Sequence, residues 1–148
     1  FGLPQNATLD DWRKAADELN EIGMKVKESG LQMGYHNHHM EFAKIDDQLI
    51  YDVLMEQFDP EYIKMQFQVA VINIGYKAAD YFRKYPGRFI SAHLADYAED
   101  KKTQVPIGKG IVDWKEFFDT LETGGLKNIF VEMDQETFKE SAEYLKSI

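Results

Sequence analysis

The chain begins with one helix-like run of apolar positions and continues with four short stretches in which apolar and polar residues alternate. Thr8 suits the cap of the first helix, with Asp11 at the capping-box position, and Gly30 suits the position after its end. The alternating stretches predict strands at residues 31–37, 63–68, 89–94 and 128–132. Turn and capping residues predict helices after them, at about 48–58, 76–84, 113–124 and 135–146.

This order, one helix followed by four strand–helix pairs, is typical of an α/β fold. Each strand–helix–strand unit predicts parallel strands joined by right-handed crossovers, with helices covering the sheet. No linker or repeat divides residues 1–148, so the sequence predicts a single domain. The loop at 96–112, which contains Pro106, Gly108 and Gly110, is longer than most connections in compact domains and is therefore predicted to be functional or mobile.

Composition narrows the classes of partner. The 148 residues are 44% hydrophobic, enough for a core, and carry a net charge of −9. Nucleic-acid binding needs a basic surface, so it is not expected. No apolar run reaches the roughly 18 residues that span a bilayer, and no signal peptide is visible at Phe1; the cytoplasm is the preferred location and the periplasm the alternative. Without cysteine the chain has no disulfide, no thiolate nucleophile and no cysteine zinc site.

Polar residues stand at the carboxyl ends of all four predicted strands: His36, Gln68, His93 and Glu132. Parallel α/β folds place their chemistry at these ends. If the strands belong to a closed barrel, alternation points these side chains toward its axis. Imidazole, amide oxygen and carboxylate groups can ligate a divalent cation, so the sequence predicts a site there.

Plainer interpretations stay open for most of these residues. His36 and His38 share a strand face and can equally be interior histidines bonded to neighbours, because buried polar groups are usually satisfied. A lone His93 is more often structural, and His39 is expected on the opposite face or in the loop. Glu132 differs, since an inward-pointing carboxylate is costly to bury without a partner.

Four segments resemble, in this order, the motifs of the sugar phosphate isomerase/epimerase family of xylose-isomerase-like TIM barrels. They are Tyr35-His36-Asn37-His38 with Glu41-Phe42, Lys84-Tyr85-Pro86-Gly87-Arg88 leading to His93-Leu94-Ala95-Asp96, Gly108 to Trp114, and Phe130 to Asp134. A full barrel takes about 250 residues, so the resemblance, which runs from about residue 8 to the end, implies the C-terminal (β/α)4 half of a TIM barrel. The first half-barrel, or another copy of the chain, would then complete it.

The resemblance also implies a metal site, because family members hold a divalent ion (Mn, Co, Zn or Mg) with a glutamate, an aspartate, a histidine and a second glutamate. By position His93 matches the histidine and Glu132 the last glutamate. His36 stands in place of the first glutamate, Gln68 in place of the aspartate, and Ala95 in place of a common lysine. One carboxylate is left to balance a dication, so metal affinity is expected to be low.

The function implied is that of an isomerase or epimerase acting on a small-molecule sugar. Glu132 or His38 would be the base that removes a proton beside a carbonyl, and His38, Glu41 and Lys109 would contact the substrate. The alternative is a non-catalytic carbohydrate-binding member with a degenerate metal site. Metal-dependent phosphodiester cleavage, as in the related endonuclease IV barrels, is least favoured, because an acidic surface repels DNA.

Overall fold

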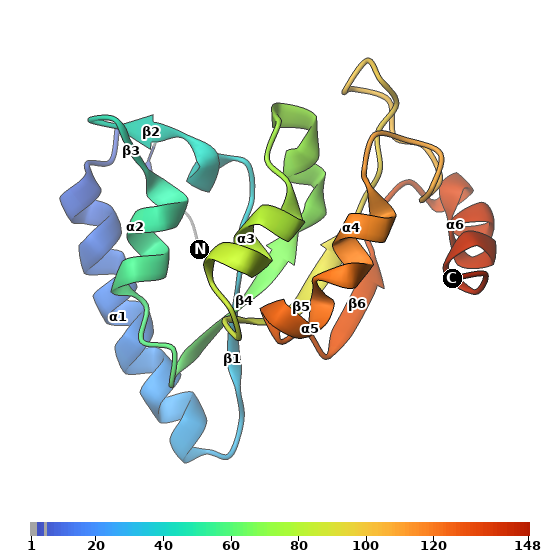
Figure 1. Ribbon diagram of the computed structural model, residues 1–148. Coiled ribbons are helices and arrows are strands. Elements are labelled where there is room, and N and C mark those ends of the chain that lie inside the picture. Colours follow the sequence, from blue (N-terminus) through green and yellow to red (C-terminus); the bar gives the residue numbers. More distant parts are fainter. Residues whose placement is uncertain (1–2, 5) are drawn as a thin grey trace. The chain divides into compact units, whose positions relative to one another are not determined.

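A computed structural model describes residues 3–4 and 6–148 (Figure 1). The chain divides into two compact units, Phe1–Lys64 and Met65–Ile148. In the part of the chain described, no helix is long and apolar enough to cross a membrane.

Two helices dominate the first unit, α1 (Leu9–Glu28) and α2 (Ile50–Gln57), which pack side by side (Figure 1). The predicted capping box is confirmed: the Asp11 N–H donates to Thr8 Oγ1 at 3.2 Å, and the Thr8 N–H donates to the Asp11 carboxylate at 2.9 Å. Gly30 follows the helix with φ +78°, as predicted. The other elements of the unit are β1 (Met33–His36), η1 (Met40–Phe42), β2 (Lys44–Ile45) and β3 (Gln48–Leu49).

β2 and β3 form a small antiparallel hairpin in which Lys44 pairs with Leu49. Asp46 and Asp47 connect the strands with φ values of 49° and 62°. Positive φ at both central residues is the pattern of a type I′ turn, the turn that suits two-residue hairpins. The sequence predicted a helix from about residue 48. That start is wrong, because residues 48–49 pair with β2 and α2 begins at Ile50.

The second unit contains a parallel sheet of β4 (Ile63–Gln68, entering from the first unit), β5 (Phe89–Leu94) and β6 (Asn128–Val131). The predicted α/β class and the parallel direction of these strands are confirmed. Its helices are η2 (Val69–Ile74), α3 (Ala78–Lys84), α4 (Trp114–Asp119), α5 (Leu121–Gly124), η3 (Gln135–Thr137) and α6 (Phe138–Leu145).

A bulge interrupts the pairing of β4 with β5. Met65 pairs with Phe89, but the next residue, Gln66, pairs with Ser91, so Ile90 has no partner of its own on β4. An extra residue in one strand reverses the alternation of side chains beyond it. The side chains of β5 beyond Ile90 therefore point to the face opposite to the one that alternation counted from Phe89 would give.

The bulge corrects one prediction. Strict alternation over residues 89–94 puts Phe89 on the same face as Ser91 and His93. This prediction is wrong, because Phe89 packs against Phe82 of α3, with ring centroids 4.8 Å apart, and against Phe67 at 6.0 Å. Its ring thus joins the aromatic core beneath the helices. Beyond the bulge, Ser91 and His93 lie on the other, polar face of the sheet, beside the side chains of Gln66 and Gln68.

The predicted helix over residues 113–124 is divided into α4 and α5. Asp113 caps α4 as predicted, with Oδ1 accepting the Glu116 N–H at 2.9 Å. The division falls at Thr120, whose hydroxyl donates to the carbonyls of Glu116 and Phe117 at 3.0 and 2.9 Å. Such back-bonding by a threonine competes with the helical ladder and bends it.

Candidate functional site

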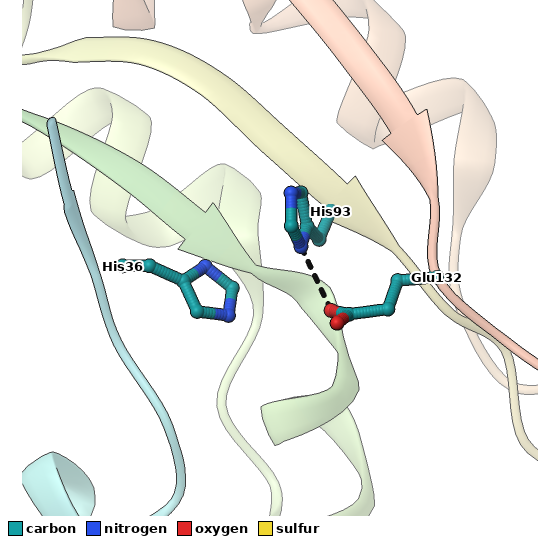
Figure 2. Close-up of side chains that lie close together, drawn as sticks. All are labelled: His36, His93 and Glu132. Carbon is teal, nitrogen blue, oxygen red and sulfur yellow. Dashed lines mark hydrogen bonds and ion pairs between the residues drawn. The ribbon is translucent and has the colours of Figure 1, made fainter.

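Three of the predicted site residues, Gln68, His93 and Glu132, form one hydrogen-bonded group in the second unit. His93 Nδ1 lies 2.7 Å from Glu132 Oε2 (Figure 2), and the Gln68 amide nitrogen donates to the same oxygen at 2.5 Å. Of the four side chains predicted to point to one place, which also include His36, these three lie together, so this part of the prediction is confirmed.

Strand register explains this arrangement. Gln68 pairs with His93 across β4 and β5, and His93 pairs with Phe130 across β5 and β6. Glu132 lies two residues after Phe130, on the same side of the chain, and its N–H continues the ladder by donating to Leu94 O at 3.0 Å. The carboxylate can then reach back over the imidazole of the neighbouring strand.

Gln68 is oriented from both ends of its amide. It ends β4 and caps η2, and its Oε1 accepts the Ala70 N–H at 3.1 Å. The first N–H groups of a helix lack intrahelical acceptors, so the amide oxygen satisfies one of them. The amide nitrogen is left to face Glu132, which fixes the side chain as a donor toward the carboxylate.

The burial predicted for Glu132 is wrong, because its side chain is 54% exposed and that of His93 is 22% exposed. An ionised carboxylate only accepts hydrogen bonds, so His93 Nδ1 carries the proton that it shares with Oε2. The Glu132 carboxylate is therefore half-exposed, with two N–H donors on one of its oxygens, and a solute can approach it.

Gln68 does not fit as a ligand of a divalent cation in this arrangement. A cation requires lone pairs directed at one point. Glu132 Oε2 already accepts two N–H groups, and the Gln68 amide presents hydrogen atoms to that point while its oxygen serves η2. Metal ligation by His36, Gln68, His93 and Glu132 stays a prediction, which this geometry does not favour for Gln68.

In the first unit, His36 and His38 are neighbours, with ring centroids 4.8 Å apart in an edge-to-face contact. His39 lies in the loop before η1 and is exposed, as predicted.

Glu41 is 1% exposed, and its carboxylate accepts the Tyr35 hydroxyl at 2.7 Å and the His38 N–H at 2.8 Å. Burial, together with the Glu41 charge, raises the pKa of Tyr35. Glu41 thus holds the turn that presents His38; its contact with a substrate stays a prediction.

Asp96 organises the long loop after β5, a role that the sequence did not reveal. Its side chain is fully buried, and the carboxylate accepts five N–H groups. Oδ1 accepts from the backbone of Tyr97 and Val112 at 3.0 and 3.1 Å, and Oδ2 from the backbone of Gly108 and Gly110 and from the Trp114 indole at 3.1, 3.2 and 2.8 Å. One side chain therefore fixes a loop of some 16 residues at both ends.

Each of the two glycines of this loop is required for a different structural reason. Gly108 has φ +87°, a conformation that side chains disfavour, and a Cβ at Gly110 would overlap the Asp96 carboxylate. Lys109, between them, is exposed, and its N–H donates to Pro106 O at 2.9 Å. The loop thus presents Lys109 to solvent from a fixed backbone, and its contact with a substrate stays a prediction.

Ala95, which the resemblance sets in place of a lysine, is fully buried. It belongs to an apolar cluster with Ala70 and Tyr97, against which Ile72, Ile111 and Met133 pack. A charged side chain at this position would enter an apolar environment, which is costly without a partner. The apolar surroundings of residue 95 therefore suit alanine.

The same loop contains a turn that we expect to open at low pH. The Asp100 carboxylate accepts the Thr103 hydroxyl at 2.6 Å and the Thr103 and Lys102 N–H groups at 2.9 and 2.8 Å. These bonds, of which that from the Thr103 hydroxyl has the largest effect, lower the pKa of Asp100 from 3.8 to about 2.

Because the pKa of Asp100 is depressed in the folded state, the turn's contribution to stability is complete above pH 3.8 and is lost as the pH falls through 2. The Thr103 amide shift should titrate near pH 2, and Thr103→Val should move that midpoint upward; an unchanged midpoint would contradict the assignment.

Comparisons with known proteins agree with the α/β fold. The family model of the xylose isomerase-like TIM barrel matches residues 2–148. An inosose dehydratase of Clostridium perfringens is 27% identical over 97 residues, an alignment that covers 65% of this chain and 32% of that enzyme. An inosose dehydratase of Lacticaseibacillus casei is 25% identical over 152 residues, and this alignment covers 89% of this chain and 50% of that enzyme. The crystal structure of a sugar phosphate isomerase/epimerase from Parabacteroides distasonis superposes with a TM-score of 0.83 at 24% identity, covering 99% of this chain and 57% of that one. This chain thus spans between a third and just over half of the length of these relatives.

Proposed function

Because this chain belongs to the xylose isomerase-like TIM-barrel family, we propose that it is part of an enzyme that removes a proton next to a carbonyl of a sugar or a related polyol ketone, as isomerases and epimerases do. One observation carries the proposal: the Glu132 carboxylate stands half-exposed at the end of β6, oriented by N–H donors from His93 and Gln68. A general base must be ionised, held in place and accessible, and this carboxylate meets the second and third conditions.

In the proposed step, Glu132 takes the proton from the carbon beside the carbonyl. The electron pair of the broken C–H bond forms a carbon–carbon double bond, and the carbonyl oxygen takes up the negative charge as an enediolate. Delivery of a proton to the opposite face of the same carbon, by water or another donor on that side while Glu132 keeps the abstracted proton, gives an epimer. Return of the proton by Glu132 to the former carbonyl carbon, with the proton of the neighbouring hydroxyl moving to the former carbonyl oxygen, gives an isomer. His38, Glu41 and Lys109 keep their predicted contacts with the substrate, and His36 its predicted place as a metal ligand, on the basis of the sequence alone.

Dehydration is a second candidate, favoured by the similarity to two inosose dehydratases. Loss of water beside a carbonyl also begins with removal of the adjacent proton. The two outcomes separate afterwards, when a hydroxyl group on the next carbon either stays or leaves. Glu132 serves the same purpose in both.

Proton exchange tests the shared first step. The protein is incubated in D2O with a panel of ketoses and keto-polyols, and the proton beside the carbonyl is followed by NMR. Exchange with stereochemical or positional change supports the isomerase or epimerase, whereas exchange with loss of water supports the dehydratase. Saturable sugar binding without exchange of any compound in the panel would refute the enzyme and favour the carbohydrate-binding alternative.

The proposal includes a complementary half-barrel. On β6, the last strand of the sheet order within the second unit, Ile129 is 36% exposed and Phe130 is 50% exposed, so apolar side chains are left uncovered on both faces of this edge strand. Exposed apolar sheet surface favours association. We expect the chain expressed alone to associate with a second copy or with an added first half-barrel, which light scattering would detect as a mass above that of one chain. A strictly monomeric chain at high concentration would contradict this expectation.

A further inference from the structure

The geometry points to Gln68 as a positioning residue that takes the place of a cation, so that Glu132 works without a divalent metal. This inference deepens the proposed function, since it concerns the base assigned there. The two ends of the Gln68 side-chain amide have different partners. Oε1 accepts the Ala70 N–H at 3.1 Å, and the amide nitrogen donates to Glu132 Oε2 at 2.5 Å.

The Gln68 amide cannot be turned over so that its oxygen and its nitrogen exchange partners. Turning the amide over would direct its nitrogen at the Ala70 N–H and its oxygen at the carboxylate, which opposes donor to donor and acceptor to acceptor. Gln68 is 8% exposed, so water cannot readily relieve either conflict. The cap of η2 therefore fixes Gln68 as a donor toward Glu132.

The Gln68 amide N–H and the His93 imidazole together satisfy the carboxylate oxygen that a cation would use. The amide offers only partial positive charge, so it orients Glu132 without cancelling a full negative charge as a dication would. A carboxylate at position 68 would do the opposite. It would keep the cap through one oxygen and set a second negative charge against Glu132, an arrangement that a cation relieves.

The sequence offers a matched control two residues away. Gln66 is on the same strand and the same face, but its amide donates to Ser91 Oγ at 2.9 Å. Gln66→Glu adds the same charge to the same surface without opposing Glu132. Only Gln68→Glu should create a metal site.

Mn²⁺ titration of the protein and its variants, followed by the EPR signal of the free ion, tests this. We expect Gln68→Glu to bind Mn²⁺ about 10-fold or more tightly than the unaltered protein, since affinity for hard cations depends on ligand charge. Its thermal midpoint should fall in chelator and recover with Mn²⁺, and Gln66→Glu should match the unaltered protein. If Gln68→Glu does not fold, the unaltered protein still decides: stoichiometric Mn²⁺ binding that Glu132→Gln abolishes overturns the inference, and its absence supports it.

The two proposals fail in different ways. Proton exchange by the unaltered protein that is indifferent to chelator supports both. Exchange that stops in chelator and returns with Mn²⁺ leaves the proposed function standing and overturns the role of Gln68. No exchange in any condition, with Mn²⁺ bound only by Gln68→Glu, overturns the proposed function and supports the role of Gln68.

Discussion

Glu132→Gln should lower the rate of proton exchange beside the substrate carbonyl by about 10²- to 10⁴-fold, the usual contribution of a general base. Glutamine has the shape of glutamate, so β6 and the reach of the side chain toward His93 are preserved. An amide cannot take up the proton. NMR exchange rates and substrate affinity measured on the same samples separate this effect from a loss of binding.

Glu136→Gln is the matched control, because Glu136 is an exposed glutamate of η3 only four residues along the chain. It removes one negative charge from the same region without touching His93 or Gln68. Exchange should continue at the original rate. If both variants lose exchange equally, net charge rather than the Glu132 carboxylate governs the reaction.

Much of the fold was predictable from side-chain alternation. The bounds of β4 and β5 match the predicted strands, because a strand with one apolar and one polar face repeats every two residues. Alternation fails at Ile90, where the bulge reverses the pattern. A bulge is a property of two paired strands, so the sequence of β5 alone cannot indicate it.

The candidate site was predictable as a set of residues but not as a set of contacts. Strand ends indicated Gln68, His93 and Glu132, and these side chains do meet. The direction of the Gln68 amide depends on the η2 cap, which the pattern of residues 69–74 did not reveal. The exposure of Glu132 was also missed, because position on a strand face does not determine how many neighbours cover a side chain.

The burial of Asp96 was not predictable from the sequence, because aspartate is seldom buried without partners. A buried carboxylate needs donors. The glycines at 108 and 110 bring backbone N–H groups close enough to supply them. Recognising this requires knowing that the loop folds back onto its own start, which is a tertiary property.

Asp96→Ala should destabilise the second unit by about 3–5 kcal/mol, because five N–H donors lose a buried acceptor and only part of them can turn to water. Total stabilities of domains are about 5–15 kcal/mol, so this loss is a large fraction. Urea unfolding measures the loss. Faster hydrogen exchange at Gly108, Gly110 and Val112 would place it in the loop.

Two further variants test whether the carboxylate itself is responsible. Asp96→Asn should cost less than alanine, because an amide oxygen at the Oδ2 position keeps the donors from Gly108, Gly110 and Trp114, whereas the amide nitrogen faces those of Tyr97 and Val112. Asp100→Ala removes an aspartate of the same loop whose bonds are local and exposed, and it should affect only its own turn. Equal urea midpoints for Asp96→Ala and Asp100→Ala would mean that other contacts hold the loop. The Lys109 backbone would then be fixed independently of Asp96.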